Sequence, residues 1–142
     1  MEPELINTTV KKPEPINILR KRLNIIRSRL YLLEKQDRMI MSMYIDNGLS
    51  LRQLALLFDT SPSSISRRIK KIAFELTKGD FISCLKKKDV FTHSEMTIAK
   101  DYFVTGLSIK QIAERENTSF YQIRELITEI RQTLNRIQKE KQ

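Results

Sequence analysis

The sequence contains the stretch Gly48-Leu49-Ser50-Leu51-Arg52-Gln53-Leu54-Ala55, and later in the chain it contains the similar stretch Gly106-Leu107-Ser108-Ile109-Lys110-Gln111-Ile112-Ala113. Sliding the chain against itself until Gly48 meets Gly106 aligns residues 34–76 with residues 92–134 without a gap, and 13 of the 43 paired positions are identical. The identities fall on apolar, glycine and helix-capping positions, which are the positions that determine a fold. The sequence therefore predicts two copies of one structural unit.

Each copy is predicted to be a helix, a glycine break, a short helix, a tight turn and a longer helix. In the first copy, Gly48 is placed to end a helix and Ser50 to cap a short helix of about Leu51–Phe58. Ser61 then caps the longer helix, and Pro62 suits its first position. Two helices joined through such a short turn are typical of a helix-turn-helix. The longer helix has an inner apolar stripe of Ile65, Ile69, Ile72 and Leu76.

The second copy repeats this pattern. Thr92 and Glu95 have the spacing of a capping box, and Ser108 and Ser119 take the places of the two serine caps. Its inner stripe is Ile123, Ile127, Ile130 and Leu134. The alternative interpretation is a helical bundle in which the repeat serves packing alone.

Composition supports an all-α protein that binds a polyanion. Among 142 residues there are only three glycines and four prolines, so little interrupts long helices. The net charge of +9 favours a nucleic-acid partner. The single cysteine and single histidine exclude an intrachain disulfide and a His/Cys metal site, and no apolar run is long enough to span a membrane. We expect a cytoplasmic protein with no metal and no cofactor.

The predicted organisation has six segments. Residues 15–33 form a basic amphipathic helix, which either packs onto the protein or pairs with a second chain as a homodimer. The first and second helix-turn-helix units occupy residues 34–79 and 90–138, and both lack a wing. The remaining segments are a flexible tail, a linker and a second tail, at residues 1–14, 80–89 and 139–142.

The first copy resembles region 4 of bacterial sigma-70-type factors. The resemblance rests on the stretches Leu33–Ile40, Gly48–Ala55 and Ser61–Ile65, and the second copy, from Glu95 to Ile130, looks like a more diverged version. The resemblance implies a helix-turn-helix that binds DNA, and a contact with RNA polymerase. The rest of a sigma factor is not recognisable, and Pro62-Ser63-Ser64 replaces the arginine- and glutamate-rich start of that family's reading helix.

The reading surface is predicted on the longer helix of the first copy. In a helix-turn-helix the N-terminal part of this helix enters the major groove, where arginine and serine contact bases and lysine contacts phosphates. Residues 62–76 sum to a charge of +3, whereas the matching residues 120–134 sum to zero. The candidate DNA-binding residues are Ser61, Ser63, Ser64, Ser66, Arg67, Arg68, Lys70 and Lys71.

Two further sets of residues are candidates for secondary contacts. The second copy begins its longer helix with side chains suited to a protein or DNA contact, namely Phe120, Tyr121, Gln122 and Arg124. The amphipathic helix carries arginines suited to phosphate contacts, namely Arg20, Arg22, Arg27 and Arg29.

The sequence thus favours a sequence-specific double-stranded DNA-binding protein that regulates transcription. Two alternatives remain: an adaptor that binds RNA polymerase or another protein, and the DNA-recognition protein of a phage or mobile element. No glycine-rich phosphate loop or nucleophile elbow is present. An enzyme with a small-molecule substrate is therefore not expected.

Overall fold

The computed structural model describes residues 16–140, with side chains from residue 21 onward, and every regular element in that range is a helix. This confirms the all-α fold class. Within the described residues, the chain divides into two compact units between Thr77 and Lys78. The tail predicted for residues 1–14 lies outside the described range.

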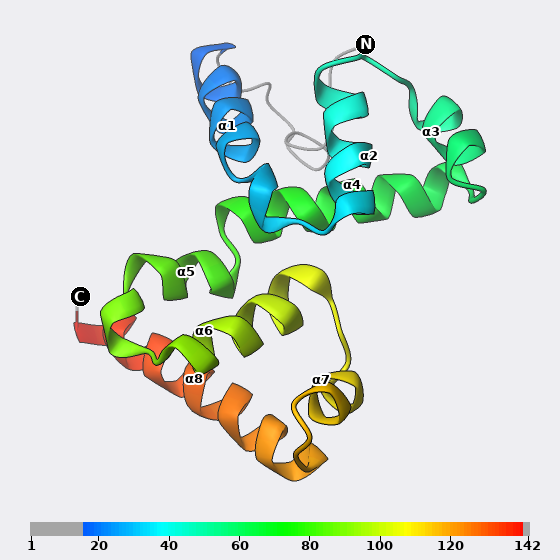
Figure 1. The fold of residues 1–142 in the computed structure, drawn as a ribbon. Helices are drawn as coiled ribbons and strands as arrows, with labels where there is room; N and C mark the ends of the chain where they lie inside the picture. The colour runs from blue at the N-terminus through cyan, green and yellow to red at the C-terminus, as the bar shows by residue number, and fades with distance from the viewer. Residues whose placement is uncertain (1–15, 141–142) are drawn as a thin grey trace. The chain divides into compact units, whose positions relative to one another are not determined.

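The first unit packs three shorter helices against one long helix, α4 (Figure 1). The chain passes from α1 through a short 3-10 turn, η2, into α2 and α3 before it reaches α4. The predicted inner stripe of α4 is buried, with at most 4% of each of its four side chains exposed. The elements are α1 (Ile16–Ser28), η2 (Leu30–Leu32), α2 (Lys35–Ile45), α3 (Leu51–Leu57) and α4 (Pro62–Thr77).

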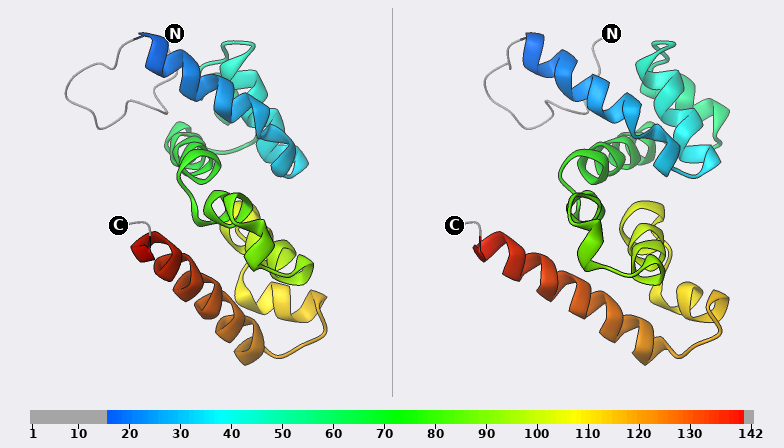
Figure 2. Two further views of the ribbon diagram at one scale, coloured as in Figure 1. Left: turned by 90° about the vertical axis from the view of Figure 1, so that its left-hand side faces the viewer. Right: turned by 60° about the vertical axis from the view of Figure 1, so that its left-hand side comes forward.

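The second unit repeats the arrangement, with three shorter helices against the long helix α8 (Figure 2). Here the helix that follows the 3-10 turn η3 changes to π-helical geometry in its last part, η4. The predicted stripe of α8 is also buried, with at most 5% of each side chain exposed. The elements are α5 (Asp80–Lys86), η3 (Lys88–Val90), α6 (His93–Ala99), η4 (Lys100–Thr105), α7 (Ile109–Arg115) and α8 (Phe120–Glu140).

The helix caps form where the sequence predicted them. Thr92 and Glu95 make a reciprocal capping box at the start of α6. Ser50 also forms a capping box, with Gln53, and Ser108 does so with Gln111. At the two long helices, the hydroxyls of Ser61 and Ser119 each accept a hydrogen bond at 3.1 Å from the backbone N–H three residues later. Each cap satisfies N–H groups that a helix start leaves without intrahelical partners.

Left-handed backbone geometry recurs at aligned positions of the two copies. Gly48 and Gly106 end their helices with φ of 68° and 80°. Asp59 and Asn117 stand in the turns that lead to α4 and α8, with φ of 53° and 55°. The sequence predicted a tight turn between the two helices, and only the structure shows that Asp59 takes this conformation. Asp and Asn are the non-glycine residues that adopt it most readily, because their short polar side chains bond locally.

The segment predicted as a linker, residues 80–89, instead forms α5 and η3 and buries Phe81, Ile82 and Cys84. Its backbone repeats the end of α1. Arg29 N–H donates to the Ile26 carbonyl at 3.0 Å, and at the aligned positions of the second unit Lys87 N–H donates to the Cys84 carbonyl at 3.1 Å. The repeat therefore begins before residue 34, in a region without sequence identity, and the described part of each unit has the same order of helices.

Two other helix ends differ from the predicted segments. The amphipathic helix was expected to reach residue 33, but α1 ends at Ser28 and the chain tightens into η2. This turn places Leu32 and Leu33 in the core, with 6% and 4% of each exposed. At the other end of the chain, α8 continues to Glu140, into the predicted tail at 139–142.

Replacing Gly48 with Ala should lower the free energy of unfolding by about 1–2 kcal/mol, because a Cβ is strained in left-handed geometry. A Cβ built at Gly48 meets nothing within 4 Å, so the cost is backbone strain alone. Urea unfolding of Gly48→Ala beside Gly48→Asn measures it, and the Asn variant should lose less. Equal stability of the Ala variant and the wild type would contradict the left-handed helix end.

Burial, with a smaller contribution from the nearby Asp80 and Glu95 carboxylates, raises the pKa of Cys84 from 9.0 to about 11. Since the folded-state pKa is the higher one, the thiol favours folding below about pH 9, and this contribution is lost as the pH rises toward 11. At pH 8 the native thiolate fraction is roughly 100-fold below that of an ordinary thiol. Iodoacetamide should therefore modify native protein at least that much more slowly than urea-unfolded protein, and equal rates would show that Cys84 is accessible.

Candidate nucleic-acid interface

The N-terminal half of α4 presents a polar, basic surface. Ser63, Arg67, Lys70 and Lys71 are exposed, and Ser66 is half-buried. The positions recur every three to four residues, so they lie on the face opposite the buried stripe. A shallow hollow on this face brings together Leu51 of α3 with Pro62, Ser63, Ser66, Arg67 and Lys70 of α4.

The serines at the start of α4 order this surface. The Ser61 hydroxyl lies 3.0 Å from the Ser64 hydroxyl and caps the helix through the Ser64 N–H. Arg67 Nη2 donates to Ser64 Oγ at 3.2 Å. No ion pair involves Arg67 among the described residues, and its side chain is exposed. Ser61 and Ser64 thus serve mainly to cap the helix and position Arg67.

The sequence predicted Arg68 on the DNA-binding surface, but in the structure its side chain bonds residues of α2. Its Nε donates to Asp37 Oδ1 at 2.6 Å, and its Nη2 donates to Gln36 Oε1 at 3.2 Å. Asp37 is 7% exposed, the one buried charged residue of the described chain. Arg68 therefore joins α4 to α2 and neutralises this carboxylate. Its position next to Ile65 and Ile69 of the stripe is the sequence signal for this role.

The arginines of α1 also contribute to the fold. Arg27 Nε lies 2.9 Å from Asp46 Oδ1, at the end of α2. Arg29 Nη1 donates to the Leu76 carbonyl at 2.6 Å, where α4 ends and its last carbonyls lack helical partners. Arg22 is half-buried and engaged, and the Arg20 side chain lies outside the described residues. Arg27 and Arg29 are thus poorer phosphate contacts than their sequence positions indicated.

The start of α8 aligns with the polar, basic surface of α4, but it exposes aromatic side chains instead. Phe120 and Tyr121 are 51% and 61% exposed, and the Arg124 guanidinium lies 6.0 Å from the centre of the Tyr121 ring. Gln122 Oε1 accepts hydrogen bonds from the Thr118 hydroxyl and the Ser119 N–H, which directs its amide into the helix cap.

The N-terminal halves of α4 and α8 also differ in charge. In the alignment of the two copies, Glu125 takes the position of Arg67, and Glu129 takes the position of Lys71. Carboxylates at these positions repel phosphates, whereas the arginine and lysine of α4 attract them. The polar surface of α4 is therefore the better candidate interface for nucleic acid.

No family model, curated protein or solved structure matches the chain. Within the described residues, no group of three or more His, Cys, Asp or Glu side chains is arranged to hold a metal ion. None of the described helices combines the length and apolarity that a membrane span requires.

Arg68→Ala should lower the free energy of unfolding by about 1–3 kcal/mol, because it leaves the buried Asp37 carboxylate without its charged partner. Arg67→Ala, one residue away and exposed, should change it by no more than about 0.5 kcal/mol. Urea unfolding of both variants, with Asp37→Asn/Arg68→Ala as a third, measures the difference. The double variant should regain part of the loss, and similar stabilities for the two single variants would refute the structural role of Arg68.

Proposed function

We propose that the protein is a sequence-specific double-stranded DNA-binding regulator of transcription. The helices α3 and α4 act as a helix-turn-helix, and the N-terminal half of α4 enters the major groove. The helices α7 and α8 form a second, tandem helix-turn-helix with a lesser part in DNA recognition. The proposal rests above all on the outward face of α4, where an arginine outside any described ion pair is ordered among serines and followed by two lysines.

Each side chain on this face has a chemical role in DNA binding. The planar guanidinium of Arg67 is suited to donate two hydrogen bonds to the O6 and N7 atoms of guanine. Ser63 and Ser66 bond bases or phosphates with less discrimination. Lys70 and Lys71, one turn further along α4, are suited to phosphates beside the groove. Together they provide both a base-reading contact and a salt-dependent contribution to affinity.

The resemblance of residues 33–65 to sigma region 4 supports the regulatory role, and it makes RNA polymerase the protein partner to test. In that proposal the chain acts in the cytoplasm beside the transcription machinery. A homodimer would read a palindromic site with half-sites about one helical turn apart, whereas a monomer would read adjacent segments with its two units.

The second candidate function is an adaptor that binds RNA polymerase or another protein and has little affinity for DNA. The exposed aromatic pair Phe120 and Tyr121 favours it, since aromatic residues are enriched in protein interfaces. The DNA-binding regulator should select a defined sequence from a random pool of duplex DNA, whereas the adaptor should not.

Selection of bound sequences from random duplex DNA is the experiment that tests the proposal. An enriched motif supports sequence-specific recognition, and the symmetry of the motif separates a dimer from a monomer. Weak, strongly salt-dependent binding without an enriched motif would contradict the proposal and favour the adaptor.

For the selected site, Arg67→Ala should weaken binding by about 1–3 kcal/mol and relax the preference at one base pair. Lys70→Ala and Lys71→Ala should weaken binding to all sequences and each reduce the slope of log affinity against log salt by about 0.9. Fluorescence anisotropy titrations at several salt concentrations measure both effects. Glu125→Gln, at the position in α8 that matches Arg67, is the control and should leave affinity within about twofold. Unchanged affinity of Arg67→Ala would show that Arg67 is not part of the base-reading surface.

A further inference from the structure

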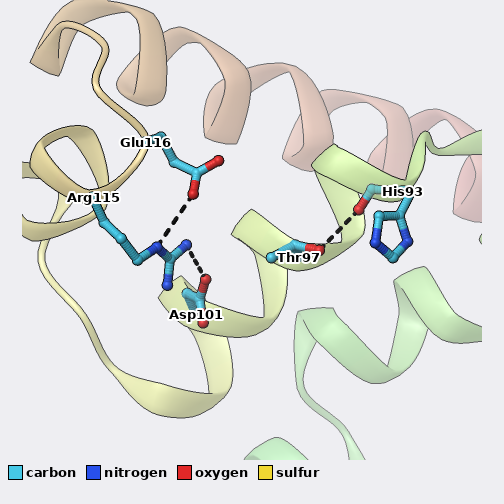
Figure 3. Close-up of polar contacts among 5 residues, drawn as sticks. All are labelled: His93, Thr97, Asp101, Arg115 and Glu116. Carbon is cyan, nitrogen blue, oxygen red and sulfur yellow. Dashed lines mark hydrogen bonds and ion pairs between the residues drawn. The ribbon is translucent and has the colours of Figure 1, made fainter.

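The two units differ on one aligned surface, which is polar on α6, η4 and α7 of the second unit and apolar on α2 and α3 of the first. In the second unit this face is polar (Figure 3). Arg115 of α7 forms an ion pair with Asp101 of η4, and its Nε donates to Glu116 Oε2 at 3.2 Å. The hydrogen bond to Asp101 raises the pKa of Arg115 above its ordinary value. The Thr97 hydroxyl donates to the His93 carbonyl at 3.1 Å. Asp101 and Glu116 of this face are thus both paired with Arg115.

In the first unit the side chains at the aligned positions are apolar. Met39 and Met43 stand in place of Thr97 and Asp101, and Leu57 stands in place of Arg115. Leu56 matches Glu114, another charged residue. The exposed fractions are 40% for Met39, 79% for Leu56 and 61% for Leu57. We refer to Met39, Met43, Leu56 and Leu57 as the α2–α3 apolar face.

The fold itself does not require these apolar residues. The second unit makes the matching turn with polar side chains, including the backbone hydrogen bond from Leu107 N–H to the Asp101 carbonyl at 2.9 Å. The same bond joins Leu49 to Met43 at 3.1 Å in the first unit. Met43 is half-buried, and the ion pair between Asp101 and Arg115 shows that the positions aligned with Met43 and Leu57 adjoin. Since exposed side chains such as Met39, Leu56 and Leu57 add little to a monomer, apolar residues at these positions of α2 and α3 indicate an interaction site.

Three basic side chains lie on α2 and α3 close in sequence to the α2–α3 apolar face. Lys35 lies one turn before Met39 on α2, Arg38 is its neighbour in sequence, and Arg52 lies one turn before Leu56 on α3. All three are exposed, and no ion pair involves any of them in the part of the chain that the structure describes. The acidic groups of α2 and its C-terminal cap are already paired, Asp37 with Arg68 and Asp46 with Arg27. Glu34, directly before Lys35, and Asp59, just after α3, are exposed carboxylates that offset part of this charge, so these five groups leave the rim with a net charge of +1.

We propose that the α2–α3 apolar face binds an acidic amphipathic helix of another protein. The apolar stripe of that helix contacts the leucines and methionines, and its flanking carboxylates meet Lys35, Arg38 and Arg52. Apolar side chains on two adjoining helices suit the i, i+3, i+4, i+7 anchors of a bound helix. Methionine adapts to the shape of such a partner. Self-association through this face is disfavoured, because a two-fold interface would place the basic rim against itself.

Binding of two synthetic helical peptides to the full 142-residue chain tests this proposal. Both peptides span about five helical turns, with leucine at i, i+3, i+4 and i+7. One carries glutamate and the other lysine at the flanking positions. Fluorescence anisotropy should show at least tenfold tighter binding of the acidic peptide. The matched variant Met43→Asp/Leu57→Arg gives the first unit the ion-pair residues of the second, and it should bind the acidic peptide at least tenfold more weakly.

Two controls test whether weaker peptide binding comes from the changed surface or from unfolding of the variant. Circular dichroism melting of Met43→Asp/Leu57→Arg should match the wild type, and its affinity for the selected DNA site should be unchanged. If that variant does not fold, Leu56→Glu, at the most exposed position, should weaken peptide binding by a similar factor. The proposal is overturned if the acidic peptide does not bind, if the lysine peptide binds equally well, or if the variants bind like the wild type. Concentration-dependent dimerisation lost in Leu56→Glu would also overturn it, because the occupant would be a second copy of the chain.

Discussion

The turn between α3 and α4 determines how the first unit is built. Asp59 takes left-handed geometry, the Thr60 N–H donates to the Ala55 carbonyl at 2.9 Å, and Ser61 caps the next helix. Because these three features lie so close together in the chain, they fix both the direction in which α4 leaves α3 and its rotation about its own axis. That rotation buries the isoleucine stripe and leaves Ser63 and Arg67 outside. A change of one residue in this register would turn each side chain of α4 by about 100°.

Comparison of the two units distinguishes the features that the fold requires from the features that are particular to one unit. Shared structural features appear at aligned positions of both units, namely the serine caps of α3, α4, α7 and α8, the left-handed turns and the buried stripes. Surface residues differ: glutamates of α8 replace arginine and lysine of α4, and polar residues of η4 and α7 replace apolar ones of α2 and α3. Because the common features suffice for the fold, the differences indicate function. They motivate the two proposals, that α4 binds DNA and that the α2–α3 apolar face binds a protein.

The ion pair between the half-buried Arg68 and the buried Asp37 connects the structure to the candidate site. Arg68 adjoins Arg67 in sequence, yet its guanidinium faces α2, since residue 68 lies next to the stripe on the helix. The pair joins α4 to α2 and supports the helix that displays Arg67. The second unit has Leu126 and Glu95 at these positions, so this link is particular to the first unit.

The sequence by itself determined the all-helical class, the two copies, the serine caps and the buried stripes. These features depend on interactions within about four residues or on helical periodicity, and such signals are local. Only the tertiary structure showed that residues 80–89 form a helix matched to α1, that Arg68 is paired, and that Arg29 binds the end of α4. Arg68 meets Asp37 across 31 positions of the chain, and Arg29 meets Leu76 across 47. Contacts of this separation depend on how whole helices pack, and no short pattern in the sequence records that.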